Sequence, residues 1–245
     1  MILFPAIDLI AGQVVRLRQG DRSQMDVYAT NPVAVAEDFA ARGARWIHVV
    51  DLSATFGEDA DACEKNARAI RAICGVEGIS VDTGGGVRDM ASIERLVDAG
   101  AKRIAIGTAL VRDPAFAEEA AARYGELLVA DVAAKGGQVR VNGWREGEAL
   151  HADELVARLS ALGYQHLVFT DVARDGMQTG IDADAYRHIS EVAGFPVVAS
   201  GGIATLEDVR ALARLGGDVI EGAITGRALY EGAFTLEDAL EAFSC

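Results

Sequence analysis

Three cysteines and four histidines are the only thiol and imidazole groups in this chain of 245 residues. The cysteines are Cys63, Cys74 and Cys245, an odd number with no CxxC spacing. The histidines form no HxxxH or HxH pair. A zinc site needs clustered thiol or imidazole ligands, and a disulfide framework needs paired cysteines. The sequence therefore predicts neither of these.

Long apolar runs and an excess of positive charge are also missing. No apolar stretch approaches the roughly 18 residues that a membrane helix needs. The apolar start, MILFPAIDLI, contains Asp8 and follows no basic region, which favours a strand over a signal peptide. The formal net charge of −14 repels nucleic acid and anionic membranes. We expect a cytoplasmic protein that binds neither.

Short apolar segments alternate with amphipathic ones along the whole chain. Strands are expected at 2–8, 45–51, 78–83, 102–107, 126–131, 165–170, 196–200 and 218–224. Helices are expected at 32–43, 61–74, 89–100, 113–124, 151–163, 182–194, 205–215 and 235–243. Strict alternation predicts an α/β fold with a parallel sheet, and its eight units predict a single (βα)8 TIM barrel over residues 1–245. An open, doubly wound sheet is the alternative fold.

The chain repeats itself at half-length, which predicts two (βα)4 halves at about 1–122 and 123–245. GGGVRDMASIERL at 84–96 corresponds to SGGIATLEDVRAL at 200–212, and GTAL at 107–110 to GRAL at 226–229. Four landmarks match in the same order at offsets of 116 to 123 residues. A barrel built in this way should have a site with quasi-twofold symmetry.

Glycine-rich turns follow the third and fourth strand of each half, and such turns can bind phosphate through backbone amides. TIM barrels often bind phosphate after their last two strands, beside a short extra helix, here expected at 227–230. The predicted phosphate ligands there are Gly201, Gly202, Gly226 and Arg227, with the Asp175-Gly176 turn alongside. The repeat predicts a second phosphate site at Gly85, Gly86, Gly107 and Thr108. The alternative is that these glycines only form tight turns.

Asp8 and Asp131 each end a predicted strand, at the end of the barrel where active sites are built. They occupy equivalent places in the two halves, so they should face each other across the barrel mouth. Two carboxyl groups beside one substrate can act as a general base and a general acid. The alternative role for a strand-end aspartate is to cap a helix or to pair with a buried arginine.

Other side chains near the predicted mouth each have two alternative roles or a single supporting one. Thr170 could donate a hydrogen bond to a reacting oxygen. Arg16 and Arg18 could reach a phosphate, although solvation at the surface is the alternative. Trp144 lies in a predicted loop, where it could stack on a planar base or pack beneath the loop. His48 alternates away from Asp51 on its strand, so we expect it to face the helices.

Taken together, PAIDLIAGQVVRLRQGD, HVVDL, GGGVR, IGTAL, NGW, TDVARDG, ASGGI and GRALYEG resemble the ProFAR isomerase family of histidine biosynthesis. ProFAR is phosphoribosylformimino-aminoimidazole carboxamide ribotide. The resemblance runs nearly end to end and implies an Amadori rearrangement of an aminoaldose that carries two phosphates. It implies that Asp8 is the base at C2′, that Asp131 protonates the ring oxygen and that Thr170 assists. It also implies that no cofactor or metal is needed, and we expect a monomer.

Three other functions compete with this one. The cyclase subunit of imidazole glycerol phosphate synthase has a similar repeated barrel, but that family tends to show Pro-Cys-x-Asp where this chain has Pro5-Ala6-Ile7-Asp8. A dual-substrate isomerase that also accepts phosphoribosyl anthranilate is the second alternative, and the GGG at 84–86 argues against it. The third is a non-catalytic protein that binds phosphorylated metabolites. Two aspartates at the mouth would weaken a pure anion site, because like charges repel.

Overall fold

A computed structural model describes residues 1–18, 21–177 and 179–244. Its centre is a closed ring of eight parallel strands, in which β1 pairs with β12 and β7 with β10. The ring order is β1 (Ile2–Ile10), β4 (Trp46–Asp51), β5 (Ser80–Gly84), β6 (Arg103–Ile106), β7 (Leu128–Lys135), β10 (His166–Asp171), β11 (Val197–Ser200) and β12 (Ile220–Thr225). The ring confirms the predicted (βα)8 barrel and excludes the open sheet.

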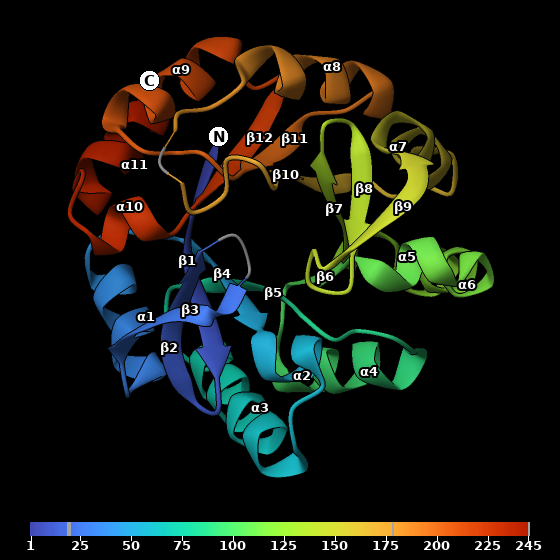
Figure 1. The fold of residues 1–245 in the computed structure, drawn as a ribbon. Helices are drawn as coiled ribbons and strands as arrows, with labels where there is room; N and C mark the ends of the chain where they lie inside the picture. Colours follow the sequence, from blue (N-terminus) through green and yellow to red (C-terminus); the bar gives the residue numbers. More distant parts are fainter. Residues whose placement is uncertain (19–20, 178, 245) are drawn as a thin grey trace.

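Helices surround the ring (Figure 1). They are α1 (Pro32–Ala41), α2 (Leu52–Phe56), α3 (Ala60–Cys74), α4 (Met90–Ala99), α5 (Thr108–Arg112), α6 (Pro114–Tyr124), α7 (Ala152–Ala161), α8 (Ala183–Ala193), α9 (Leu206–Leu215), α10 (Arg227–Tyr230) and α11 (Leu236–Ser244), with a 3₁₀ turn at Gly125–Leu127. Among the helices described, none is long and apolar enough to cross a membrane. The short helix α10 was predicted, whereas α2 and α5 are too short to show a periodic pattern.

Each barrel strand has two buried faces, which explains its nearly continuous apolar sequence. The outer face packs against the helices in one large hydrophobic core. The inner face forms a small separate cluster of Phe4, Ala105, Val129, Val168 and Val198. This plug of side chains fills the middle of the barrel, so the polar groups above it line a pocket with a closed floor.

Part of the acidic charge has a structural role at the helix ends. The carboxylates of Asp59, Asp89, Asp113 and Asp182 each accept a hydrogen bond from a backbone amide in the first turn of α3, α4, α6 and α8. Aspartate is a favoured residue at this position because it satisfies an otherwise unpaired amide and complements the helix dipole. These aspartates therefore mark where helices begin.

Two antiparallel extensions were not predicted. Strands β2 (Gln13–Arg18) and β3 (Asp21–Ala29) follow β1, and β8 (Gln138–Val141) and β9 (Glu146–His151) follow β7. Because these hairpins pair with β1 and β7, both barrel strands run on past Asp8 and Asp131, which were wrongly expected to end them. The hairpins follow the first strand of each predicted half. Division of the chain into two repeated halves nevertheless stays a prediction.

The amino-terminal end of the barrel contains an enclosed charged cluster. Glu221 accepts one hydrogen bond from Arg103, at 2.5 Å, and its other carboxylate oxygen is 3.1 Å from Nδ1 of His166. The Arg103 guanidinium also lies over the Trp46 ring, 4.9 Å from its centroid. Arg103 and His166 outweigh the effect of burial, which on its own raises the pKa of Glu221, and together they lower it.

We expect Glu221→Gln to destabilise the barrel by about 3 kcal/mol, because it leaves Arg103 enclosed without a counter-charge. Since the pKa of Glu221 is lowered in the folded state, its stabilising effect is present above pH 4.5 and is lost as the pH falls through the lowered pKa. Urea unfolding of both proteins at pH 7 and pH 3 measures this difference. An equal difference at both pH values would contradict the assignment.

Candidate active site

One pocket opens at the carboxyl ends of the barrel strands and encloses about 270 Å³. Every barrel strand, or the loop after it, contributes to its lining. The predicted site residues that line it are Asp8, Asp131, Thr170, Gly85, Gly86, Gly107, Thr108, Asp175, Gly176, Gly201, Gly202, Gly226, Arg227 and Trp144. The side chain of Arg18 lies outside the described part of the chain. Residues spread over the whole sequence thus share one cavity.

Asp131 is half-buried in the pocket wall, on β7. Burial raises its pKa to about 6, and the nearby Asp82 carboxylate adds to this effect while His48 opposes it. A carboxyl group with this pKa is partly protonated near neutral pH. Asp131 can therefore donate a proton, which an ordinary exposed aspartate cannot do efficiently at that pH.

Asp8, on β1, has a different environment. Its carboxylate pairs with the guanidinium of Arg16 at 2.6 Å. Arg16 is itself buried, donates to the backbone carbonyl of Ala6 and lies over the Tyr230 ring. Burial disfavours its charge, but carboxylates, chiefly that of Asp8, outweigh this effect and raise the pKa of Arg16. Arg16, one of the two arginines suggested as phosphate ligands, thus pairs with the Asp8 carboxylate inside the pocket.

Asp175 is a third carboxyl group at the pocket. Burial raises its pKa to about 6, and repulsion from Asp8 adds to this effect while Arg16 opposes it. Asp175 was predicted to lie in a phosphate-binding turn. The raised pKa of Asp175 was not predicted, because burial of a turn residue depends on how the loop after β10 folds over the barrel.

The two glycine-rich ends of the pocket have matching backbones. Gly107 and Gly226 precede the short helices α5 and α10 with nearly equal torsion angles, φ −110° and ψ −94° against φ −122° and ψ −97°. In neither of these helices, as described, does a side chain cap the first turn. Their first amides therefore remain available to an anion in the pocket. Arg227 is fixed at one end by a 2.9 Å hydrogen bond to the carbonyl of Gly176.

The glycines after β5 and β11 have a packing role that the sequence did not reveal. Gly85 and Gly201 have φ of +97° and +88°, and a Cβ atom on either would collide with the backbone carbonyl of Asp51 or Asp171. These two carbonyls belong to corresponding strands of the predicted halves. Glycine is thus required for backbone packing between neighbouring strands, in addition to any contact with a ligand.

Replacing Gly202 with valine should disturb the loop above the pocket as well as ligand binding. Gly202 has φ +88°, and an added Cβ would lie 2.5 Å from the carbonyl oxygen of Gly180. We expect at least a ten-fold rise in KM together with a loss of about 1–3 kcal/mol of stability. Steady-state kinetics and thermal unfolding check this. A higher KM with unchanged stability would mean that the side chain acts on the ligand alone.

The predicted loop around Trp144 is the tip of the β8–β9 hairpin. Asn142 and Trp144 both have left-handed backbones, with φ of +56° and +67°. The backbone amide of Asn142 donates to the Thr108 hydroxyl at 2.9 Å, and the Arg145 guanidinium lies 5.3 Å from the centroid of the Phe56 ring. These contacts hold the tip against α5 and α2 and place Trp144 in the pocket lining.

Comparison with known proteins agrees with this architecture. A family model described as histidine biosynthesis protein matches residues 2–235. The chain belongs to this family. A relative from Moorella thermoacetica is 42% identical over 240 residues, which cover 98% of this chain and 97% of the relative. Relatives from Rhodopseudomonas palustris and Rhodospirillum rubrum are 43% and 42% identical over 240 residues, covering 98% of this chain and 96% and 98% of their own lengths. All three are named 1-(5-phosphoribosyl)-5-((5-phosphoribosylamino)methylideneamino)imidazole-4-carboxamide isomerase.

One histidine of this histidine biosynthesis family protein lies on the other face of its strand from the one predicted. His48 was expected to face the helices, but it lines the pocket, and its Nδ1 lies 3.1 Å from a carboxylate oxygen of Asp82. The strand register explains the error. Asp51, which served as the reference, turns outward to cap α2, where it accepts a hydrogen bond from the amide of Ala54. The alternation was therefore counted correctly, but Asp51 was placed on the wrong face.

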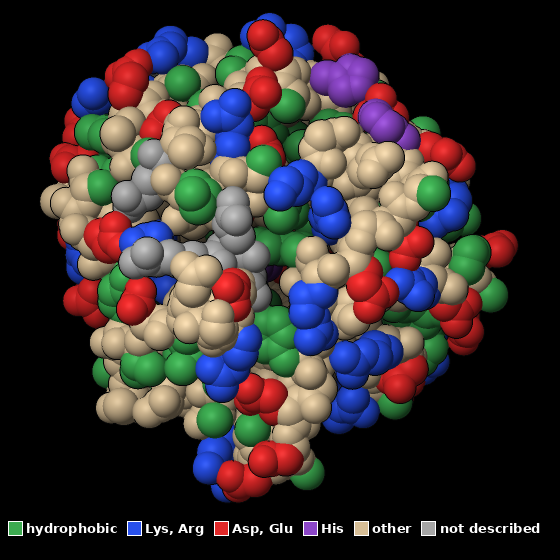
Figure 2. All heavy atoms as spheres, viewed as in Figure 1, with side chains coloured by type: hydrophobic (Ala, Val, Ile, Leu, Met, Phe, Trp, Pro, Cys, Tyr) green, Lys and Arg blue, Asp and Glu red, His purple; other side chains and the backbone are tan. Residues whose placement is uncertain are grey.

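Lys and Arg side chains gather around the central hollow of the mouth face (Figure 2). Arg16, Arg88, Arg140 and Arg227 all contribute to the pocket lining. Within the described residues, no group of three or more His, Cys, Asp or Glu side chains is arranged to hold a metal ion. The pocket therefore combines a basic rim with a few enclosed carboxyl groups, in a protein whose net charge is −14.

Proposed function

We propose that this protein is an isomerase that converts the aminoaldose ProFAR into the aminoketose PRFAR by an Amadori rearrangement. One observation supports this most strongly. Asp8 and Asp131 line one pocket whose ends carry two matching sets of glycines, Gly85 with Gly107 and Gly201 with Gly226. A substrate with a phosphate at each end would hold its reacting sugar between the two carboxyl groups. The full-length similarity to relatives that are named as isomerases of this substrate supports the same conclusion.

The reaction needs a proton donor and a proton acceptor at one sugar. Asp131 would donate a proton to the ring oxygen as the bond from C1′ to that oxygen breaks. Asp8 would then remove the proton from C2′, and the resulting enolamine becomes the aminoketose when C1′ gains a proton and the C2′ hydroxyl loses one to form the carbonyl. The pKa of about 6 suits Asp131 to donation, and Asp8, held in place by its contact with Arg16, is the carboxyl group assigned as the acceptor. Thr170, buried on β10 at the pocket, would assist as a hydrogen-bond donor.

Each phosphate would bind at one end of the pocket. Backbone amides at the starts of α5 and α10 carry the partial positive charge of a helix amino terminus, and the basic rim adds full charges. Trp144 at the hairpin tip would stack on the imidazole part of the substrate. This arrangement explains how a strongly acidic protein could bind a doubly phosphorylated ligand.

An assay of the purified protein with ProFAR tests the proposal. We expect turnover to PRFAR that is the same with and without EDTA, because neither step uses a metal ion. Phosphoribosyl anthranilate should give at least about a hundred-fold lower kcat/KM, since its anthranilate lacks the second phosphate and so leaves one end of the pocket empty. Comparable turnover of both compounds would identify a dual-substrate isomerase, and no turnover of ProFAR would reject the proposal.

Action as a monomer in the cytoplasm, without a nucleic acid or membrane partner, stays a prediction. Size-exclusion chromatography with light scattering measures the oligomeric state directly.

A further inference from the structure

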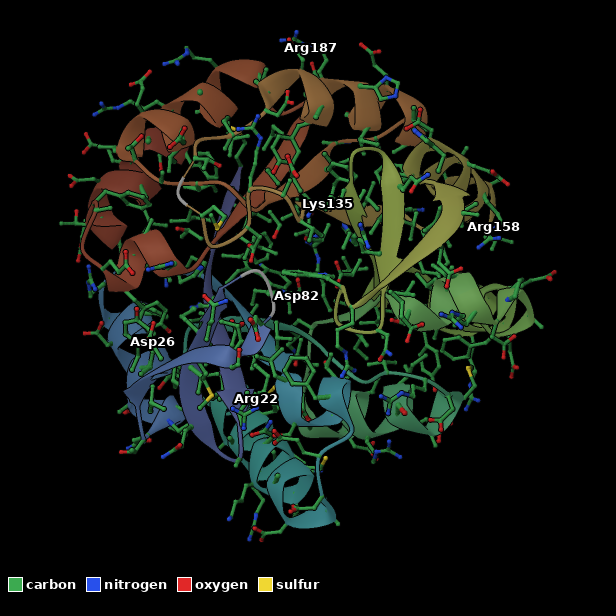
Figure 3. The ribbon with its side chains drawn as sticks, in the orientation of Figure 1. Arg22, Asp26, Asp82, Lys135, Arg158 and Arg187 are labelled. Carbon is green, nitrogen blue, oxygen red and sulfur yellow. The ribbon has the colours of Figure 1, made fainter. Side chains whose placement is uncertain are left out.

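A buried pair of ionisable side chains lies beneath the predicted catalytic aspartates. Asp82 lies inside the ring of strands (Figure 3), directly across from His48 in the register between β5 and β4. Nδ1 of His48 and Oδ2 of Asp82 are 3.1 Å apart. His48 is 8% exposed and Asp82 is 2% exposed. Neither residue has a role in the reaction steps given above.

The carboxyl group of Asp82 is buried but incompletely hydrogen-bonded. Its second oxygen, Oδ1, has no hydrogen-bond partner among the described residues. Enclosing a carboxylate without full hydrogen bonding is costly unless a positive charge lies next to it. Arg103 is level with Asp82 on the next strand, but its guanidinium pairs with Glu221. The imidazole of His48 is therefore the counter-charge that the structure offers to Asp82.

Carboxyl groups face His48 from three barrel strands, namely Asp82 on β5, Asp131 on β7 and Asp8 on β1. Burial disfavours the charged imidazole, but these carboxyl groups outweigh it and raise the pKa of His48. The geometry and the electrostatics thus agree. Asp82 makes the direct contact, and the two mouth aspartates add to its effect.

The orientation of the His48 ring decides which of its nitrogens faces the pocket. His48 lines the pocket and Asp82 does not, so the edge that carries Nδ1 faces the wall and Nε2 is left for the pocket side. A neutral imidazole that keeps its proton on Nδ1 for Asp82 presents Nε2 as an acceptor. A charged imidazole presents Nε2–H as a donor. The protonation state of His48 therefore decides whether Nε2 donates or accepts a hydrogen bond at the pocket floor.

We propose that Asp82 is a positioning residue that keeps His48 charged, so that Nε2–H of His48 donates to an oxygen of the reacting sugar. The inference rests on the proposed function, because it requires an aminoaldose between Asp8 and Asp131. No bond to His48 forms or breaks, and its proton stays on Nε2. A fixed donor at this place stabilises an oxygen on which negative charge develops during ring opening or enolisation.

NMR titration of the histidine ring in the ligand-free protein is the first test. The signal of His48 is assigned by its loss in His48→Gln. We expect a midpoint above 6.5 in the unaltered protein and a fall of about one unit or more in Asp82→Asn, because an adjacent opposite charge has been removed. A midpoint at or below 6.5 in the unaltered protein would overturn the inference.

A double-mutant cycle on kcat/KM with ProFAR is the second test. We expect Asp82→Asn to lower kcat/KM about ten-fold in the unaltered protein. In the His48→Gln background, Asp82→Asn should lower kcat/KM by less than about two-fold, because Asp82 acts through His48. An equal loss in both backgrounds would overturn the inference, since it would mean that Asp82 acts on Asp131 directly or only supports the fold.

Asp153→Asn is the matched control, because it removes a carboxylate that lies 2.9 Å from Nε2 of another histidine, His188, on the helices outside the barrel. It should leave the His48 midpoint and the cycle unchanged. Where Asp82→Asn does not fold, Asp82→Ser takes its place, and the titration of the unaltered protein still decides. An active enzyme with a neutral His48 overturns this inference alone. A protein inactive on ProFAR overturns the proposed function and, with it, the contact between His48 and the sugar.

Discussion

Replacing Asp131 with asparagine should lower kcat with ProFAR by about 10²–10⁴-fold while KM changes little. Asparagine keeps the size and polarity of the side chain but cannot donate a carboxyl proton. In the unaltered enzyme the donor form of Asp131 is lost as the pH rises through about 6, so activity should decline above that pH. The variant should lack this decline. Steady-state kinetics between pH 5 and pH 9, with the variant and the unaltered enzyme in parallel, measure both effects.

The same substitution should make the protein more stable at neutral pH. A carboxyl group whose pKa is raised from 3.8 to about 6 in the folded state costs stability whenever it is ionised. We expect Asp131→Asn to add on the order of 2 kcal/mol at pH 7 and close to nothing at pH 3, where the carboxyl group is protonated in both states. Urea unfolding at the two pH values provides the measurement.

Asp175 provides the decisive comparison, because burial raises its pKa to about 6 as well. If Asp175→Asn abolishes turnover while Asp131→Asn keeps more than a tenth of it, the ring oxygen receives its proton from Asp175 and the role assigned to Asp131 is wrong. Loss of turnover in both variants, with the decline above pH 6 removed only in Asp131→Asn, supports the assignment.

Replacing Asp8 with asparagine should also lower kcat by about 10²–10⁴-fold, because the base that removes the C2′ proton is missing. Unlike Asp131→Asn, which should stabilise the protein, Asp8→Asn should destabilise it. Arg16 is 8% exposed and would lose the carboxylate that lies 2.6 Å from it. Breaking a buried ion pair by removing one partner costs about 3–5 kcal/mol, and the asparagine oxygen recovers part of this.

Exchange of the C2′ proton with solvent deuterium separates the role of Asp8 as a base from its role as the counter-charge of Arg16. Asp8→Asn should abolish the exchange, because no base remains to remove this proton. A further variant, Arg16→Met, removes the counter-charge but leaves the base in place. It should therefore still exchange the C2′ proton, although slowly, whereas Asp8→Asn should not exchange it. Full exchange in Asp8→Asn would contradict the role of Asp8 as the base.

The acidic composition and the anion-binding pocket are compatible because the two involve different parts of the surface. Many aspartates lie at helix starts, such as Asp59 and Asp89, where they bind backbone amides. The pocket rim instead carries Arg88, Arg140 and Arg227. Local charges and oriented amides act over a few ångströms, within the screening length of physiological salt, so they outweigh the more distant net charge.

The elements that could be predicted from the sequence are those in which one short segment carries its own signal. Each predicted barrel strand overlaps an observed one, and the short helix at 227–230 forms as expected. The elements that could not be predicted are those that depend on which strands pair. The β2–β3 and β8–β9 hairpins were missed, and the face of β4 that carries His48 was reversed because Asp51 turns outward at the strand end.

The order of strands and helices, the glycine turns and the positions of Asp8 and Asp131 in two similar segments follow from the chain by itself, because periodicity and turn chemistry are local properties. Ring closure, the ion pair of Asp8 with Arg16, the burial that alters Asp131 and Asp175, and the contact of His48 with Asp82 were decided only by the tertiary structure. Each of these depends on which side chains meet across strands, and on how much water is excluded there. Neither is encoded at any single position.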